Sequence, residues 1–210
     1  MRITISDPKD RTIFKVKGSA TLGRQGLTEL FFESMEPELD QLPIVKFLKR
    51  FPEGDYEFEW IRNDGVELES EVEFTHIIPC APEALPEDGT VIGSKSDAVI
   101  SWDEVKKMVD PVATDAAEET VCTYPRDLGQ DLEIASYQVI VENSDIHLIV
   151  DLTSEDRALT VPPELLRKNT LYIFEVLAKE ESGNQTITEG FFCTGPGLSE
   201  GDCEALFEAL

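Results

Sequence analysis

Apolar and polar residues alternate along much of this chain, and this alternation predicts a mainly β protein. The segments Arg2–Ser6 and Thr12–Lys17 show it near the start. It returns in "DYEFEWIRNDGVELESEVEF", where Tyr56, Phe58 and Trp60 share one face. Such a pattern is typical of strands that bury one side of a sheet. We therefore expect the N-terminal part to form a small β-rich domain.

One short stretch has helical spacing instead. In "LPIVKFLKRF" the apolar residues recur every three or four positions: Leu42, Val45, Leu48 and Phe51. Pro43 suits the first turn of a helix, where an N–H has no partner in any case. Pro52 and Gly54 favour an end to the helix. The sequence predicts one short helix near residues 43–51, with its apolar side in the core.

The turn inside the alternating stretch decides which residues face each other. A two-residue Asp-Gly turn would set Trp60 opposite Glu69 and would mix the two faces. A three-residue loop over residues 63–65 sets Trp60 opposite Leu68 instead. Gly65 can take the left-handed conformation that such a loop requires. Because register follows the face pattern, we predict the three-residue loop.

This register gathers carboxylates on the second face. Glu59 then lies opposite Glu69, and the next such pair is Glu57 with Glu71. Glu67 shares their face. Like charges directly opposite each other are destabilising, so the face favours water and salt, or a cation. Three interpretations stay open: a solvated face, a face covered by basic groups of this chain or of a partner, and a calcium site, because calcium prefers oxygen ligands.

The second half of the chain contains further short strands broken by turn residues. "AVISWDEV" predicts a strand with Val99 and Trp102 buried, and "SYQVIVEN" and "IHLIVDL" follow it. In "TLYIFEVLAKE", four residues alternate on one face: Tyr172, Phe174, Val176 and Ala178. Short strands of this kind indicate a β-sandwich.

The motifs of this half resemble a fibronectin type III domain over about residues 82–194. Trp102 matches the Trp of strand B, and Tyr137 with Val139 matches the Y-x-V of strand C. Leu166 stands six residues before Tyr172, as in that family. The resemblance implies an immunoglobulin-like sandwich in which the Tyr172 hydroxyl bonds the backbone upstream, a tyrosine corner. The family usually has Pro-Gly where this chain has Lys168 and Asn169.

A second departure is the connection between strands B and C, from Val105 to Ala135, which is far longer than in the family. Connections of this length are usually functional or disordered. We keep three interpretations: a binding surface, a brace between domains and a disordered insert. A disulfide from Cys122 to Cys80 would support the brace by fixing the angle between the domains.

Prolines interrupt the alternation in "IIPCAPEALPEDG", at Pro79, Pro82 and Pro86. We interpret this stretch as a linker between two domains. The expected order is a small β-rich domain with one short helix (1–78), the linker (79–87), a fibronectin type III-like sandwich with a long B–C insertion (88–195) and a tail with a short helix (196–210).

The chain has four cysteines, and none forms a CxxC motif. With only two histidines in the chain, this spacing argues against a zinc site. Cys193 and Cys203 bracket "TGPGLSEGD", in which Pro and Gly allow the chain to turn back. We hypothesise a disulfide between them. Four free thiols in a reducing compartment are the alternative.

Charge narrows the range of partners. The formal net charge is -25, from 43 acidic and 18 basic residues. This balance argues against nucleic acid, because phosphate contacts need clustered Lys and Arg, and it disfavours anionic membrane surfaces. No run approaches the roughly 18 apolar residues of a membrane span. Met1 leads into "RITISD" without an apolar segment, so no signal peptide is visible in this chain.

The whole chain also resembles a group of bacterial secreted fibronectin type III-domain proteins of unassigned function. The segments "GLTELFFES", "FPEGDYEFEW" and "GNQTITEGFF" carry this resemblance. It implies an extracellular or periplasmic location. It also implies that Met1 is not the natural start and that strands of the first domain are missing.

Catalytic chemistry is not indicated. His76 and His147 stand alone on strand candidates, and no GxSxG, P-loop or GxGxxG motif is present. We predict no catalytic residues, no cofactor apart from the calcium alternative, and a non-enzymatic extracytoplasmic protein, binding or structural, that acts through protein–protein contacts. One alternative is an accessory component of carbohydrate binding or processing, which predicts a row of exposed aromatic residues. Another is a self-assembling subunit that accepts a strand from a neighbour.

Overall fold

The computed structural model describes residues 1–21, 41–93, 98–117 and 119–210. The chain divides into two compact units. Unit 1 comprises Met1–His76 and Asp110–Val121, and unit 2 comprises Ile77–Val109 and Cys122–Leu210. The predicted fold class, mainly β with two domains, is confirmed. The segment "GLTELFFES" lies outside the described residues.

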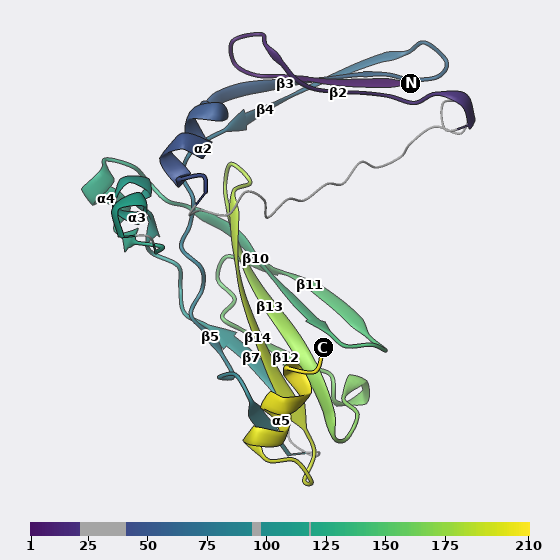
Figure 1. The fold of residues 1–210 in the computed structure, drawn as a ribbon, viewed down its shortest axis with the longest axis vertical. Helices are drawn as coiled ribbons and strands as arrows, with labels where there is room; N and C mark the ends of the chain where they lie inside the picture. Colours follow the sequence, from purple (N-terminus) through teal and green to yellow (C-terminus); the bar gives the residue numbers. More distant parts are fainter. Residues whose placement is uncertain (22–40, 94–97, 118) are drawn as a thin grey trace. The chain divides into compact units, whose positions relative to one another are not determined.

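Unit 1 contains a four-stranded antiparallel sheet in the order β2-β1-β3-β4 (Figure 1). Its strands are β1 (Arg2–Ser6), β2 (Thr12–Lys17), β3 (Gly54–Ile61) and β4 (Glu67–Phe74). The predicted hairpin register is confirmed, because Trp60 lies opposite Leu68. The N–H of Arg62 donates to the carbonyl of Val66 at 2.9 Å across the three-residue loop. Gly65 has a φ of 84°, the left-handed conformation that the loop requires.

The predicted short helix is α2 (Ile44–Arg50), with Leu42 and Leu48 buried. Unit 1 also holds a second helix, α3 (Pro111–Ala117), which comes from the B–C connection. The carboxylate of Asp115 on α3 accepts hydrogen bonds from the first N–H groups of α2, at Ile44 (2.7 Å) and Val45 (3.2 Å). This contact caps a helix whose own preceding residue, Pro43, offers no side-chain cap. The sequence had assigned these residues to the sandwich instead.

Unit 2 is a two-layer sandwich of a five-stranded sheet, β11-β10-β13-β14-β6, and a three-stranded sheet, β12-β7-β5. The first sheet is built from β6 (Thr90–Ile92), β10 (Ile134–Glu142), β11 (His147–Thr153), β13 (Thr170–Glu180) and β14 (Gln185–Thr194). The second is built from β5 (Ala84–Leu85), β7 (Ala98–Trp102) and β12 (Ala158–Val161). Neighbouring strands are antiparallel except β6, which runs parallel to β14. This arrangement is a fibronectin type III-like sandwich.

The core of unit 2 lies between these two sheets. Its largest buried side chains come from β10, β13 and β14, including Tyr137, Tyr172, Phe174 and Phe192. On β7 the buried residues are Ala98, Ile100 and Trp102. The prediction that Val99 is buried is wrong: it is 43% exposed, because successive residues of a strand point to opposite sides.

The residues that carry the family resemblance lie in or against this core. The rings of Trp102 and Tyr137 pack with centroids 5.4 Å apart. The Tyr172 hydroxyl accepts a hydrogen bond from the N–H of Arg167 (2.7 Å) and donates to the carbonyl of Leu165 (3.2 Å). Leu166 follows a short 3-10 turn, η1 (Pro163–Leu165), and packs against the core. Tyr172 thus ties the connection before β13 to the sandwich, the geometry of a tyrosine corner.

The predicted linker is part of the sandwich. Pro79 and Cys80 are buried, and the N–H of Cys80 donates to the carbonyl of Lys107 at 2.9 Å. Within residues 79–87, Ala84 and Leu85 form β5 and pair with β7. Because β5 is an edge strand, prolines beside it break no interior ladder. The boundary between the units falls after His76 instead.

The B–C connection is ordered over the residues that the structure describes. It contains β8 (Met108–Val109), α3, β9 (Cys122–Thr123) and α4 (Pro125–Leu128). The interpretation as a disordered insert is therefore wrong there. Strands β8 and β9 pair, and a disulfide joins Cys80 to Cys122 beside them. The chain thus leaves unit 2 after β8 and re-enters it at β9.

The C-terminal segment forms α5 (Glu200–Phe207). A disulfide joins Cys193 on β14 to Cys203 on this helix. The ring of Phe207 stacks on Phe191 with centroids 4.1 Å apart. Ser199 begins the helix with a capping box. The helix therefore covers one end of the outer face of the five-stranded sheet.

Candidate binding surface

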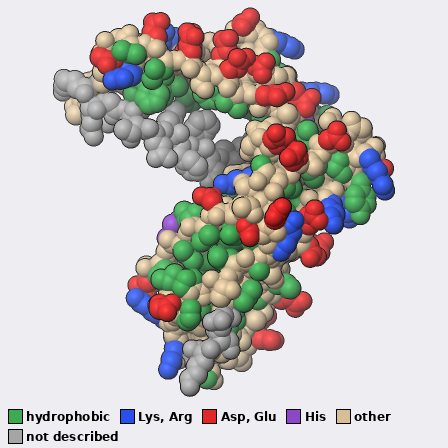
Figure 2. Space-filling model, turned by 180° about the vertical axis from the view of Figure 1, so that it is seen from behind, with side chains coloured by type: hydrophobic (Ala, Val, Ile, Leu, Met, Phe, Trp, Pro, Cys, Tyr) green, Lys and Arg blue, Asp and Glu red, His purple; other side chains and the backbone are tan. Residues whose placement is uncertain are grey.

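The two faces of the unit 1 sheet differ in chemistry. One face is apolar, with side chains from all four strands: Ile3, Ile5, Phe14, Val16, Tyr56, Phe58, Trp60, Leu68, Val72 and Phe74. The other face is charged. Figure 2 shows Asp and Glu side chains gathered along one side of this unit and hydrophobic side chains along the other. The sheet is thus amphipathic, as the alternation in the sequence predicted.

The apolar face carries a shallow hollow. Its lining residues are Ile5, Ile13, Phe51, Tyr56, Phe58, Val72 and Phe74. The Tyr56 hydroxyl donates to the carbonyl of Pro52 at 2.9 Å, and the Tyr56 ring packs edge-on against Phe74. At the β4 side this face is open, because Leu68 and Val72 remain 46% and 47% exposed.

Charges on the polar face change sign across the sheet. From β2 to β4, one row of facing residues is Lys17, Arg2, Ile61 and Glu67. The next row is Lys15, Thr4, Glu59 and Glu69. Cations therefore occupy the β2 side and carboxylates occupy the β4 side. Among the described strands, the sheet thus has a basic edge strand, β2, and an acidic edge strand, β4.

The carboxylates of β3 and β4 face one another in consecutive pairs. These pairs are Asp55 with Glu73, Glu57 with Glu71, and Glu59 with Glu69. The bond from Arg62 to Val66 marks a hydrogen-bonded pair, so by the alternation of an antiparallel ladder the acidic pairs occupy its non-hydrogen-bonded sites. Side chains approach each other more closely at those sites. The repulsion between facing carboxylates is therefore larger than it would be at hydrogen-bonded sites.

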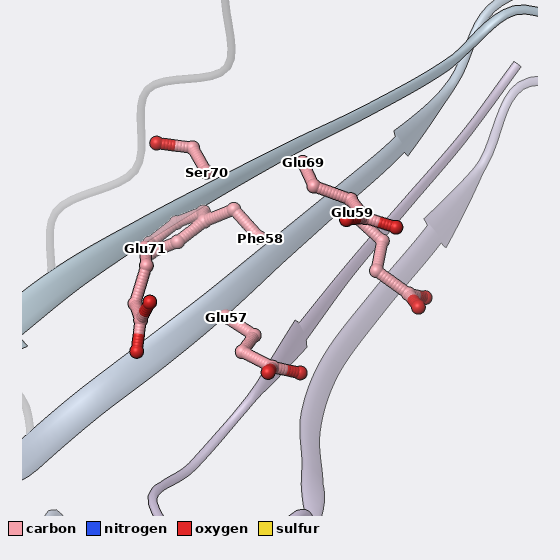
Figure 3. Close-up of a pocket in the computed structure, with 6 residues that line it drawn as sticks. All are labelled: Glu57, Phe58, Glu59, Glu69, Ser70 and Glu71. Carbon is pink, nitrogen blue, oxygen red and sulfur yellow. The ribbon is translucent and has the colours of Figure 1, made fainter.

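Figure 3 shows four of these carboxylates, Glu57, Glu59, Glu69 and Glu71, lying along the hairpin. Together with Phe58 and Ser70 they line a shallow pocket. Ser70 points away from the carboxylates. The structure thus brings together the glutamates that the sequence singled out, and Glu67 continues their face at the end of β4.

None of the ion pairs within the described residues involves these five glutamates. Cover by the chain's own basic groups is therefore not seen in that part of the chain. Nor do three or more His, Cys, Asp or Glu side chains come together there in a group that could hold a metal ion. The carboxylates follow a line instead of converging on one point, which does not suit calcium.

Strand β4 is an edge strand of the described sheet. Its residues from Glu67 to Glu73 are all exposed. Because Val66 bonds towards β3, the alternation turns the backbone N–H and C=O groups of Glu67, Glu69, Glu71 and Glu73 away from β3. An edge of this kind is a template for pairing with another strand.

The turn between β1 and β2 is held by a buried carboxylate. Asp7 is 2% exposed and accepts hydrogen bonds from the N–H groups of Lys9 (3.0 Å) and Arg11 (2.9 Å) and from the Arg11 side chain (2.7 Å). The Arg11 side-chain bond, helped by these N–H groups, lowers the pKa of Asp7 to about 2. Because this pKa is lower in the folded protein, the ionised Asp7 stabilises the fold at pH values above the ordinary pKa of an aspartate. This stabilisation is lost as the pH falls towards about 2. Asp7 therefore fixes the β1–β2 hairpin at neutral pH.

A second hollow lies in unit 2 beside the Cys80–Cys122 disulfide. Its cations already have partners. Lys106 forms an ion pair with Glu104 at 2.8 Å, and Lys107 lies over the ring of Tyr124. This hollow therefore has less charge without a partner than the acidic edge of unit 1.

The sequence did not reveal that the lysines of β2 share the charged face of the sheet with the glutamates of β4. The alternation of "TIFKVK" places Lys15 and Lys17 on one face, and this signal was available in the sequence. The order of the strands was not, so nothing indicated that these lysines share a face with the glutamates at the opposite edge. Glu73 was recognised on the charged face, but its pairing with Asp55, the third acidic pair, was missed although the predicted register implied it.

Comparison with known proteins adds little to these observations. No family model matches the chain. No curated protein matches it. Among solved structures it is similar to the FN1–FN3 domains of chicken CNTN1, with a TM-score of 0.35 and 18% identity. The match covers 69% of this chain and 45% of that one, so the chain spans less than half of its length. The fold assignment rests on the strand order of the two sheets.

Proposed function

We propose that this chain is a non-enzymatic extracytoplasmic protein that acts through protein–protein contacts, and that β4 is its binding edge. The observation that carries the proposal is the row of three acidic pairs on β3 and β4, whose six carboxylates take part in none of the ion pairs within the described residues. Such a row lowers the stability of its own hairpin. A bound partner with basic residues removes that cost.

The expected partner is an extended segment in which basic and apolar residues alternate. Added beside β4, it would bond to the outward N–H and C=O groups of the glutamates. Its basic side chains would lie opposite Glu69 and Glu71. Its apolar side chains would extend the face formed by Leu68 and Val72. Each facing pair of opposite charge contributes about 0.2–1 kcal/mol, so several pairs in a row give specificity for a basic strand.

The extracytoplasmic location is supported by the two disulfides, Cys80–Cys122 and Cys193–Cys203. Such bonds form and persist mainly in oxidising compartments. No helix among the described residues has the length and apolar character to cross a membrane.

Carbohydrate binding and histidine-based catalysis have less support. A carbohydrate platform would need a row of exposed aromatic residues. The described aromatic residues that are most exposed, Phe47 and Tyr124, belong to different units. The two histidines make structural contacts, His76 with the carbonyl of Phe51 and His147 with Glu142.

A basic peptide tests the binding edge. The probe has Lys alternating with Val over the length of β4, and a matched peptide with Glu in place of Lys is its control. We expect the basic peptide to bind the protein and the acidic one not to bind. E69K/E71K should abolish binding. E155K/E164K, on exposed residues of unit 2, makes the same change in net charge and should retain it.

Two results would contradict the proposal. If the peptide binds E69K/E71K as well as it binds the wild type, the site lies elsewhere. If E155K/E164K loses as much affinity as E69K/E71K, binding reflects only the overall charge of the protein.

A further inference from the structure

We infer that the strand which the β4 edge accepts is β2 of a second copy of this chain. The inference rests on the proposed function and specifies its partner. As described, the sheet has β2 at one edge and β4 at the other, and the lysines of β2 lie on the same face as the glutamates of β4. Two copies placed side by side therefore bring Lys15 and Lys17 of one copy to the glutamates of the other.

The backbone groups of the two edges are compatible. The N–H of Gly18 donates to the carbonyl of Met1, which marks a hydrogen-bonded pair at the end of β1 and β2. By alternation, Lys15 and Lys17 turn their own N–H and C=O groups away from β1. On β4 the glutamates likewise turn theirs outward. Both edges thus offer hydrogen bonds at residues of the charged face, which is the condition for pairing with the faces aligned.

Strand direction is compatible as well. Each neighbouring pair in the sheet is antiparallel, so β4 runs antiparallel to β2 of the same copy. A second copy in the same orientation therefore presents β2 to β4 in antiparallel fashion. We assign the register that sets Lys15 opposite Glu71 and Lys17 opposite Glu69. These are the two glutamates that face Glu57 and Glu59 within their own hairpin.

Charge selects this pairing over the symmetric ones. Two β4 edges would place glutamates opposite glutamates, and two β2 edges would place lysines near lysines. Only unlike edges are complementary. An interface between unlike surfaces is heterologous, and it continues from copy to copy unless the rotation closes a ring. We therefore expect oligomers that grow by adding further copies, and not a dimer.

The charges act against the stability of the single chain. Glu59 faces Glu69, and Lys17 faces Arg2. Reversing β4 with E69K/E71K would create two attractive pairs within the sheet, and reversing β2 with K15E/K17E would create one, with Arg2, because Lys15 faces Thr4. The same changes would create repulsive pairs between copies. Folding and association therefore respond to these variants in opposite directions, and a loss of association cannot be attributed to unfolding.

The experiment measures molar mass in solution over a wide range of protein concentration, at an ionic strength near 0.15 M that screens the long-range repulsion. We expect the wild type to rise above the monomer mass of 23.5 kDa as concentration increases. E69K/E71K alone and K15E/K17E alone should each associate at least about tenfold more weakly. Their mixture should associate again, because each variant supplies the edge that complements the other. E155K/E164K should behave like the wild type.

A wild type that stays at the monomer mass at every concentration would overturn the inference. So would two variants that associate alone as strongly as the wild type, or a mixture that fails to recover. If the basic peptide still binds β4 while the protein stays monomeric, the proposed function stands and only the identity of the partner is wrong. If neither occurs, both proposals fail.

Discussion

Two hairpins of similar length, β3–β4 in unit 1 and β13–β14 in unit 2, have opposite surroundings. In β13–β14 the inward residues Tyr172, Phe174 and Phe192 are at most 1% exposed, because the three-stranded sheet covers them. In β4 the corresponding apolar residues, Leu68 and Val72, stay almost half exposed. The difference shows that alternation specifies a strand, whereas a second layer determines how much that strand is buried.

Charge follows the same division. The β13–β14 hairpin contains one acidic pair, Glu175 with Glu189, and the neighbouring pairs on the same face are apolar, Ile173 with Phe191 and Leu177 with Ile187. The β3–β4 hairpin contains three acidic pairs in succession. A well-buried sandwich can absorb one unfavourable pair. Three such pairs in the sheet of unit 1 lower its stability, and the proposed binding of a basic partner would offset that loss.

The largest contrast between the units should appear on truncating one side chain in each. Phe192→Ala removes a ring stacked on Tyr172 and should lower the unfolding free energy of unit 2 by about 3–5 kcal/mol. Val72→Ala removes a half-exposed side chain and should cost less than about 1 kcal/mol in unit 1. The chain has two tryptophans, Trp60 in unit 1 and Trp102 in unit 2. Urea unfolding in single-tryptophan backgrounds reports each unit separately, and equal costs would refute the contrast.

The tyrosine corner gives the next largest effect. Tyr172→Phe keeps the ring and removes the hydroxyl that bonds Arg167 and Leu165. Because the partners are partly buried backbone groups, we expect the unfolding free energy of unit 2 to fall by about 1–3 kcal/mol. The fluorescence of Trp102 reports this unfolding. Tyr124→Phe, on an exposed ring of the same unit, is the matched control and should have no measurable effect. If the unfolding curve of Tyr172→Phe overlays that of the wild type, the Tyr172 hydroxyl does not stabilise the sandwich.

Asp115 tests whether the B–C connection stabilises unit 1. Asp115→Ala leaves the first N–H groups of α2 without their acceptor and should cost about 0.5–2 kcal/mol. The loss should appear in the unfolding of unit 1, which the fluorescence of Trp60 reports. This is expected even though Asp115 lies, in sequence, between the sandwich strands β7 and β10. Asp131→Ala, on an exposed residue of the same connection, is the control. A loss confined to unit 2 would show that the cap does not form.

The smallest effect has the opposite sign. E69K/E71K should stabilise unit 1 by about 0.2–1 kcal/mol for each repaired pair. Added sodium chloride should stabilise the wild type more than this variant, because salt screens the repulsion that the variant lacks. Calcium at matched ionic strength should raise the melting temperature no further than sodium does, since the described carboxylates do not converge. A wild-type response specific to calcium would restore the metal site, and a less stable variant would show that the acidic pairs are not repulsive.

Local signals predicted much of this structure. The positions of β1, β2 and α2, the hairpin loop at Gly65, and the sandwich strands around Tyr137 and Tyr172 all follow from spacing and turn residues. The five glutamates of one face follow from the register of that hairpin. Each of these inferences concerns residues that are close in sequence, where periodicity and turn geometry leave few arrangements.

Contacts between distant segments were beyond the same reasoning. Nothing in the local pattern links Asp115 to Ile44 or places β2 at the edge opposite β4. The prolines near Pro82 resembled a linker because their missing N–H groups interrupt the alternation, yet an edge strand accepts them. The error at Val99 was of another kind, because alternation itself excludes burying both Val99 and Trp102 on one side of a strand.

Backbone amide exchange along β4 is the most direct test of a binding edge. In dilute protein, the amides of Glu69 and Glu71 should exchange fast, whereas that of Ser70, which turns towards β3, should exchange slowly. With the basic peptide bound, Glu69 and Glu71 should become protected while Ser70 changes little. Protection of Glu69 and Glu71 already in the free dilute protein would contradict the account, and so would a bound peptide that leaves both amides exchanging fast.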